Sequence, residues 1–182
     1  QCLDAGAAGF EFDIFLTRDE VPVVIHRKAA EDIGVGNISF KGLSDQILPD
    51  GQKVISLEET LIYLAQLNKN RVDKPVIVNA ELKGEGVVPS SYEVIQKVSR
   101  EHGLDPGVIY FDSLNWDQLA EMRRVDPKAH LMPALSTVRL FNLKAGLPQA
   151  GQGYDSGVMK DLEQFIKDYE CIGIDIMTGD LR

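Results

Sequence analysis

Segments typical of strands and segments typical of helices alternate along this chain, and this order limits the folds that it can adopt. Short apolar runs predict strands at residues 9–17, 21–26, 74–83, 107–111, 129–135 and 171–177. Longer runs with apolar residues at helical spacing lie at residues 56–70, 90–103, 115–124 and 158–169. Such repeats predict parallel strands joined by crossover helices. A closed (β/α)₈ barrel typically needs ~250 residues, so 182 residues predict an open α/β sheet or an incomplete barrel.

Two of the predicted helices carry signals at their ends. Ser56 with Glu59, and Ser90 with Glu93, have the spacing of a capping box, in which both side chains bind backbone N–H groups at a helix start. Gly103 is placed to end the second helix, because glycine readily adopts the left-handed conformation of a helix C-terminus. The sequence therefore predicts helices that begin next to Ser56 and Ser90.

Charged residues interrupt two of the apolar strands. Side chains alternate between the two faces of a strand, so Glu11 and Asp13 would share one face while aromatic and aliphatic neighbours share the other. In the next long strand, Glu81 and Lys83 would lie together at the C-terminal end, where α/β proteins gather their active sites. In a barrel, these polar faces would point into a common interior.

This set of residues suits one kind of chemistry. Three carboxylates from two strands would repel one another unless a cation lay among them. Ca²⁺ and Mg²⁺ prefer carboxylate oxygen, so Glu11, Asp13 and Glu81 are candidate ligands of such an ion. Lys83 would offer a positive charge to a phosphate oxygen, and His26 would exchange protons near neutral pH. Together they favour cleavage of a phosphate ester.

Each of these residues also has a simpler interpretation. An amphipathic strand with one face in solvent would show the same alternation around Glu11 and Asp13. Glu81 and Lys83 would also suit an ordinary polar strand end, and a lone histidine such as His26 is more often structural than catalytic. The metal-site hypothesis is favoured because three separate segments each supply one part.

Composition excludes some classes of partner. The net charge of −9 argues against binding to duplex nucleic acid, which needs clustered Lys and Arg. No apolar run approaches the ~20 residues of a membrane-spanning helix. Cys2 and Cys171 lie far apart, which argues against a disulfide framework and leans toward a reducing, cytoplasmic compartment. Because the chain begins at Gln1, we expect that a preceding segment exists; oligomeric state does not follow from the residues.

The run "GAAGFEFDIFLTRDEVPVVIH", followed later by "VIVNAELK", resembles the glycerophosphodiester phosphodiesterase family. The matching elements are a Glu-x-Asp strand, a Thr-x-Asp turn, a Val-Val-x-His strand and an Asn-x-Glu-x-Lys strand. The resemblance covers residues 5–83 and weakens afterwards. It implies a (β/α)₈ TIM barrel that is incomplete here, with the first strand and the final strands missing, and a single truncated domain over residues 1–182.

The resemblance also implies an activity. A divalent ion, Ca²⁺ or Mg²⁺, would be held by Glu11, Asp13 and Glu81, with Lys83 near the phosphate and His26 as one of two acid–base histidines. The substrate would be a small glycerophosphodiester, hydrolysed to an alcohol and glycerol 3-phosphate through attack of the free glycerol hydroxyl on phosphorus.

Two departures keep alternatives open. The family's other histidine lies in a His-Arg-Gly strand upstream of residue 1, and Arg27 stands where the family usually has Asp. A non-catalytic relative that binds phosphate esters, or has a structural role, is therefore an alternative. The sphingomyelinase D-like phospholipases share the Glu-x-Asp strand but usually carry Asp at the position of Glu81, which ranks them lower.

Overall fold

The computed structural model describes residues 6–48, 51–136 and 156–177. Its strands form one sheet in the order β3-β2-β1-β4-β5-β6-β7. Five of them are parallel and follow chain order: β1 (Gly9–Leu16), β4 (Ile77–Leu82), β5 (Ile109–Ser113), β6 (His130–Ser136) and β7 (Asp175–Met177). Parallel neighbours in chain order are the arrangement of a (β/α)₈ barrel, and the sheet has two ends. The expectation of an incomplete α/β barrel is confirmed.

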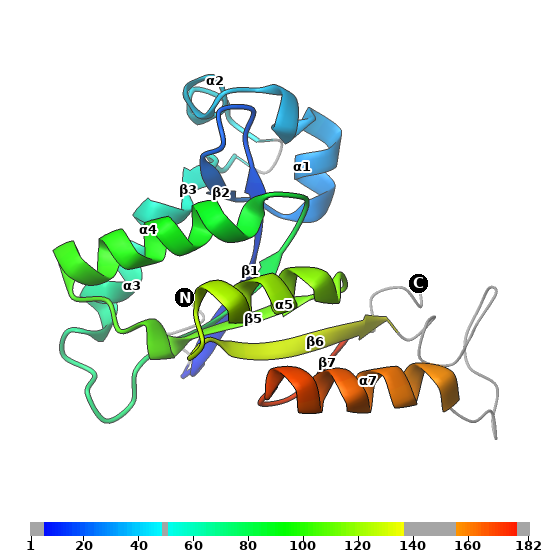
Figure 1. Cartoon of the computed structure of the whole chain (residues 1–182). Helices are drawn as coiled ribbons and strands as arrows, with labels where there is room; N and C mark the ends of the chain where they lie inside the picture. Colours follow the sequence, from blue (N-terminus) through cyan, green and yellow to red (C-terminus); the bar gives the residue numbers. More distant parts are fainter. Residues whose placement is uncertain (1–5, 49–50, 137–155, 178–182) are drawn as a thin grey trace.

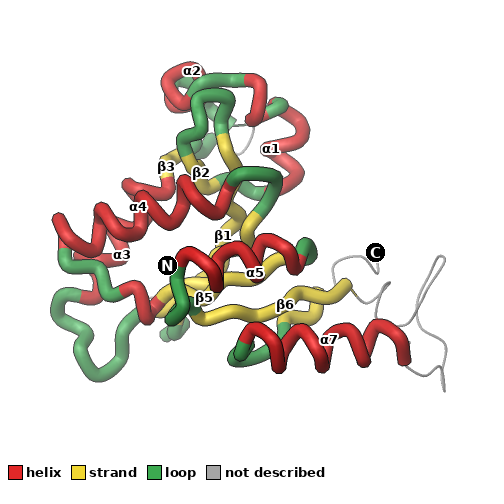
Figure 2. Tube along the Cα trace, in the orientation of Figure 1, coloured by secondary structure: helices red, strands yellow, loops and turns green. Residues whose placement is uncertain are grey.

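Helices cover one side of the parallel strands, as Figures 1 and 2 show. They are α3 (Leu57–Asn68), α4 (Val87–His102), α5 (Trp116–Val125) and α7 (Ser156–Tyr169). The apolar face of β1 packs toward them through Phe12 and Ile14, which are 7% and 0% exposed. The opposite, polar face of β1 is therefore the inner face of the barrel arc, as the alternation in the sequence predicts.

The capping box at Ser56 is confirmed. The Ser56 hydroxyl accepts a hydrogen bond from the Glu59 N–H at 3.1 Å, and the Glu59 carboxylate accepts one from the Ser56 N–H at 2.8 Å. This helix, α3, buries Leu57, Leu61 and Leu64 almost completely.

The capping box predicted at Ser90 is wrong. Helix α4 begins at Val87, and its N-cap is Gly86, which has a φ of 73° and makes no side-chain cap bond. Val87 and Val88 are fully buried, so their packing extends the helix beyond the local signal. Pro89 fits in this first turn, because a backbone N–H there has no partner within the helix. Gly103 ends the helix with a φ of 72°, as predicted.

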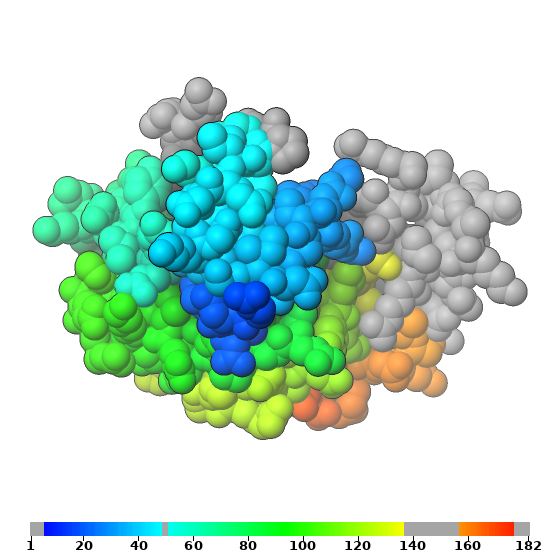
Figure 3. All heavy atoms as spheres, turned by 90° about the horizontal axis from the view of Figure 1, so that it is seen from above, coloured from blue at the N-terminus to red at the C-terminus, as the bar shows by residue number. Residues whose placement is uncertain are grey.

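Residues 17–48, which we call the excursion, connect β1 to the rest of the chain and add one antiparallel strand to the sheet. They contain β2 (Pro22–Val24), α1 (Arg27–Ile33), a 3₁₀ turn (Val35–Asn37) and α2 (Phe40–Ser44), of which only β2 was predicted. Strand β2 pairs antiparallel with β1 and with the short β3 (Ile55–Ser56). Seen from above, the excursion lies over the body of strands and helices (Figure 3).

The excursion has its own apolar core, and side-chain hydrogen bonds fix the turn at its start. Its fully or nearly buried side chains are Val23, Ile25, Ala30, Val35, Leu43 and, from outside it, Val54. At its start, the Thr17 hydroxyl donates to Asp19 Oδ1 at 2.6 Å and accepts from the Val21 N–H at 3.0 Å. Asp19 Oδ1 also accepts from the Phe40 N–H at 2.8 Å, so the Thr-x-Asp motif fixes where the excursion returns.

The last strand is shorter than predicted. The sequence predicts a strand over residues 171–177, whereas β7 covers Asp175–Met177. It pairs in parallel with the end of β6, with Ala134 opposite Asp175.

Candidate active site

The middle of β1 and the C-terminal end of β4 bring three carboxylates together on the inner face of the arc. Asp13 pairs in register with Glu81, and Glu11 pairs with Asn79. One carboxylate oxygen each from Glu11, Asp13 and Glu81 lies within 4.8 Å of the other two. The structure thus brings together the three residues that the sequence predicts as metal ligands.

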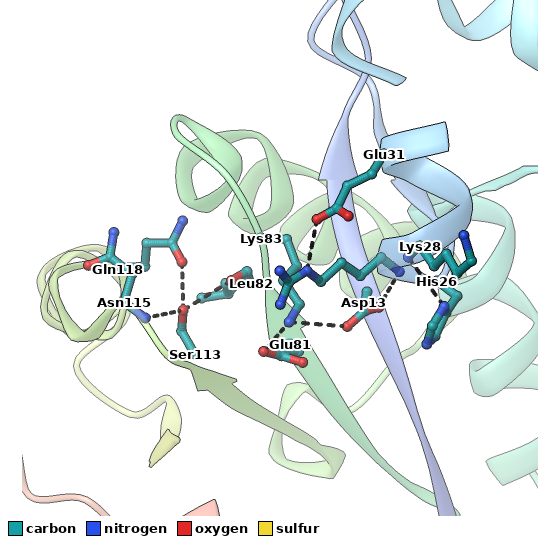
Figure 4. A network of polar contacts seen from close by, with 11 residues as sticks. Asp13, His26, Lys28, Glu31, Glu81, Leu82, Lys83, Ser113, Asn115 and Gln118 are labelled. Atoms are coloured by element: carbon teal, nitrogen blue, oxygen red, sulfur yellow. Dashed lines mark hydrogen bonds and ion pairs between the residues drawn. The ribbon is translucent and has the colours of Figure 1, made fainter. Parts of the chain in front are cut away.

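Lys83 lies beside the carboxylates of Asp13 and Glu81 (Figure 4). Its Nζ atom is 3.7 Å from Asp13 Oδ1 and forms an ion pair with Glu81 Oε1. The other oxygen of Asp13, Oδ2, accepts a hydrogen bond of 2.8 Å from the Arg27 backbone N–H. The first residue of α1 therefore orients the Asp13 carboxylate.

The carboxylates have too little positive charge around them. Burial raises the pKa of Glu81 from 4.5 to about 7, since the opposing effect of Lys83 is incomplete and Asp13 raises it further. Burial, and then the Asp13 charge, also raise the pKa of Glu11. Asp13 and Glu81 are only 7% and 2% exposed, so water screens them little. Three crowded carboxylate oxygens with unbalanced charge fit a hard divalent cation.

His26 lies within the excursion between β2 and α1, and its side chain caps that helix. The imidazole Nδ1 accepts a hydrogen bond of 3.4 Å from the Lys28 N–H. A neutral imidazole that accepts at Nδ1 carries its proton on Nε2. The capping bond thus uses Nδ1, and His26 lines the same cavity as Lys83 and Glu81.

A second group of contacts holds the loop after β4. The Ser113 hydroxyl lies 3.0 Å from the Leu82 carbonyl, to which it donates, and 2.7 Å from Gln118 Oε1. Gln118 Nε2 in turn donates to the Gly84 carbonyl. Figure 4 shows the contacts of Ser113 with Leu82 and Gln118. Because Leu82 and Gly84 flank Lys83 in sequence, β5 and α5 fix the backbone that carries this lysine.

Comparison with known proteins gives a consistent result at the level of the fold. No family model matches the sequence, and no curated protein matches it. Among solved structures, a protein of Galdieria sulphuraria assigned to the glycerophosphodiester phosphodiesterases aligns with a TM-score of 0.67 and 16% identity, over 100% of this chain and 67% of that one. An Oleispira antarctica phosphodiesterase in complex with the product sn-glycerol-3-phosphate aligns with a TM-score of 0.65 and 18% identity, over 95% and 64%. A glycerophosphodiester phosphodiesterase of Parabacteroides distasonis aligns with a TM-score of 0.60 and 24% identity, over 97% and 73%.

The chain has the fold of the glycerophosphodiester phosphodiesterases. It spans about two thirds of the length of these structures. In this barrel fold, active sites lie at the C-terminal ends of the strands, and Glu81 and Lys83 lie at that end of β4. No helix in the described residues is long and apolar enough to cross a membrane.

In this phosphodiesterase fold, a cavity of about 680 Å³ joins the parts of the site. All five residues that the sequence predicts, Glu11, Asp13, His26, Glu81 and Lys83, line it. Asp112, which lies opposite Glu81 on β5, and Asp175 on β7 also line the cavity, and neither was among the predicted site residues.

Asp112 is 1% exposed, and burial, followed by the charges of Glu81 and Asp175, raises its pKa from 3.8 to about 8. A signal for it existed in the sequence. Asp112 ends an apolar strand-like run just as Glu81 does, but the register of β5 was needed to place it.

Proposed function

We propose that this chain forms the active-site part of a metal-dependent phosphoric diester hydrolase, which cleaves glycerophosphodiesters to an alcohol and glycerol 3-phosphate. The observation that carries the proposal is the meeting of Glu11, Asp13 and Glu81 within 4.8 Å, in one cavity with Lys83 and His26. The fold shared with glycerophosphodiester phosphodiesterases supports it, as does the product sn-glycerol-3-phosphate in one structural neighbour.

Glu11, Asp13 and Glu81 would hold Ca²⁺ or Mg²⁺ through carboxylate oxygens. When bound, such an ion supplies positive charge for the phosphate oxygens as negative charge develops on them. It would also take over the role of Lys83 as the counter-charge of Asp13 and Glu81. The Lys83 ammonium would then be available to an oxygen of the phosphodiester.

His26 would act as the acid of the reaction. Cleavage of the P–O bond leaves an alkoxide, which needs a proton to depart as an alcohol. The donor is the imidazolium form: His26, which lines the cavity, would donate one ring N–H proton to the leaving oxygen and become the neutral imidazole. The raised pKa of Glu81 supports the need for a metal and not a role as base, because Glu81 belongs to the ligand group.

A direct assay tests the proposal. Glycerophosphocholine, glycerophosphoethanolamine and glycerophosphoglycerol would each be incubated with the protein and Ca²⁺ or Mg²⁺, and released glycerol 3-phosphate would be measured with a coupled dehydrogenase. We expect turnover that chelation by EDTA abolishes. His26→Gln should lower kcat by about 10²-fold or more, which is the usual contribution of general acid catalysis. His102→Gln, at the exposed end of α4, is the matched control.

This assay, together with calorimetry and a sphingomyelin substrate, separates the alternatives. Absence of turnover with every ion and headgroup would overturn the hydrolase proposal. Calorimetric binding of glycerol 3-phosphate without turnover would instead favour a non-catalytic phosphate-ester-binding protein. Release of choline from sphingomyelin, in preference to cleavage of glycerophosphodiesters, would favour the sphingomyelinase D-like alternative.

A further inference from the structure

Two carboxylates on the inner face remain outside the proposed metal site and lack a counter-charge. Asp112 comes from β5 and Asp175 from β7, and both line the 680 Å³ cavity. Within the described residues, the one carboxylate group that satisfies metal-ligand spacing is Glu11, Asp13 and Glu81, without these two. One divalent ion and Lys83 would bring three positive charges to five carboxylates.

Besides Lys83, the Lys and Arg side chains that line the cavity are already engaged. Arg27 forms an ion pair with Glu31 at 2.8 Å, and Lys28 forms one with Asp32 at 3.0 Å, both along the exposed side of α1. Their charges are thus matched on their own helix. Within the described residues, the cavity therefore offers Asp112 and Asp175 no cation of their own.

The unpartnered oxygen of Asp112 points to a ligand and not to a solvated acidic surface. Asp112 is 1% exposed, and its Oδ1 atom has no hydrogen-bond partner among the described residues. Asp175, half-buried beside it, interacts directly with the same side chain. A buried carboxylate oxygen without a donor is strongly unfavourable, so a group that brings N–H donors and positive charge would stabilise this pair.

We propose that Asp112 and Asp175 form a subsite for a primary ammonium group carried by the leaving alcohol of the substrate. This rests on the proposed function and narrows it to ethanolamine-type glycerophosphodiesters. The same cavity already shows the chemistry, since the primary ammonium of Lys83 lies between Asp13 and Glu81.

The placement agrees with the size of such a headgroup. Asp112 pairs in register with Glu81 on the neighbouring strand, and neighbouring strands lie about 4.8 Å apart. The subsite therefore begins one strand away from the metal ligands. Two carbons join the ester oxygen and the nitrogen of ethanolamine, which suits a step of this length.

The lining of the cavity favours a primary over a quaternary ammonium. Quaternary ammonium groups have no N–H donor, and proteins bind them chiefly with aromatic side chains. The described residues that line this cavity include no Phe, Tyr or Trp. A second divalent ion is the weaker choice, because Ca²⁺ takes 6–8 oxygen ligands and only two carboxylates gather here.

Headgroup preference tests the subsite. We would measure kcat/KM with glycerophosphoethanolamine, glycerophosphocholine and glycerophosphoglycerol for the parent, Asp112→Asn and Asp175→Asn. Glu163→Gln, which removes one exposed charge on α7, is the matched control. The parent and the control should prefer the ethanolamine substrate by about tenfold or more, as expected for a charge-assisted hydrogen bond. Each Asn variant should bring the three values to within about threefold.

Binding gives a second readout that does not depend on turnover. With Ca²⁺ present, calorimetry should show tighter binding of phosphoethanolamine than of phosphocholine in the parent, and equal binding in both Asn variants. Asp175→Asn keeps the test valid if Asp112→Asn fails to fold, since Asp175 lies at the sheet edge.

Three results would overturn the inference. Equal hydrolysis of all three headgroups by the parent would leave the proposed function intact and remove the subsite. A preference for the ethanolamine substrate that survives in both Asn variants would show that Asp112 and Asp175 do not cause it. Two Ca²⁺ ions bound per parent chain, and one per Asp112→Asn chain, would assign the pair to a second metal. A binding preference without any hydrolysis would instead contradict the proposed function and keep the subsite.

Discussion

Replacement of Glu81 by Gln should uncouple the stability of the protein from divalent metal. Glu81 is 2% exposed and is one of the three carboxylates that meet within 4.8 Å. Gln keeps the size of the side chain and removes its charge. At a Ca²⁺ concentration 100 times Kd, binding stabilises the folded state by about 2.7 kcal/mol. For a chain of this size each kcal/mol shifts Tm by ~2–4 °C, so the parent should gain roughly 5–11 °C at pH 8.

The pH dependence of this gain follows from the pKa of Glu81. Metal binds the carboxylate form, and the pKa of Glu81 is raised to about 7 in the metal-free protein. At pH 5.5, Glu81 is mostly protonated, so apparent affinity should fall by about thirtyfold, since each pH unit below the pKa is tenfold. The same Ca²⁺ concentration should then stabilise the parent by only about 1 kcal/mol, or ~2–4 °C in Tm.

Without metal, the order of stability of the parent and Glu81→Gln should be reversed. An acid whose pKa is raised on folding binds more protons folded than unfolded, so stability falls as pH rises from about 4.5 to 7. The rise from 4.5 to about 7 at Glu81 corresponds to ~3 kcal/mol. Without metal at pH 8, Glu81→Gln should therefore be at least as stable as the parent. Asp112, whose pKa is about 8, should extend the fall toward pH 8 in the parent.

Thermal melts followed by circular dichroism measure all these values, with CaCl₂ titrated at pH 5.5 and pH 8 and Glu163→Gln as control. Equal Tm gains in the parent and Glu81→Gln would refute the assignment of Glu81 as a ligand. A Ca²⁺ response that does not change between the two pH values would refute the argument from its raised pKa.

Four further substitutions test the fold around the site. Ser56→Ala should lower the free energy of unfolding by about 1 kcal/mol through loss of the confirmed cap, whereas Ser90→Ala should change it much less. Urea denaturation measures both values, and equal losses would show that Ser90 caps α4 after all. Thr17→Val removes the hydroxyl that forms hydrogen bonds with Asp19 and Val21, so Tm should fall by ~2–8 °C, and kcat should fall because His26 loses its position. An unchanged kcat would show that this turn does not position His26. Gly9→Ala places a Cβ against the Ile77 carbonyl oxygen, so it should weaken the pairing of β1 with β4. Amide hydrogen exchange should then be faster in both strands, and an unchanged exchange rate would contradict this contact.

The sequence by itself determined which side chains share a face. Alternation along a strand is a local property of the extended backbone, so Glu11 with Asp13, and Glu81 with Lys83, could be assigned to common faces from spacing alone. The cap of α3 was predicted for the same reason, because Ser56 and Glu59 interact within one helical turn. The parallel order of the strands followed from the alternation of strands and helices.

Only the tertiary structure decided what lies between elements. The register of β5 against β4 sets Asp112 opposite Glu81, and it depends on packing across 31 positions of the chain. Burial of Val87 and Val88 overrode the local signal at Ser90, because removal of apolar side chains from water stabilises more than one cap. The approach of Asp175 to Asp112 joins β7 to β5, two strands that do not pair with each other. Such contacts have no local signature, since the free energy that fixes them comes from the whole sheet.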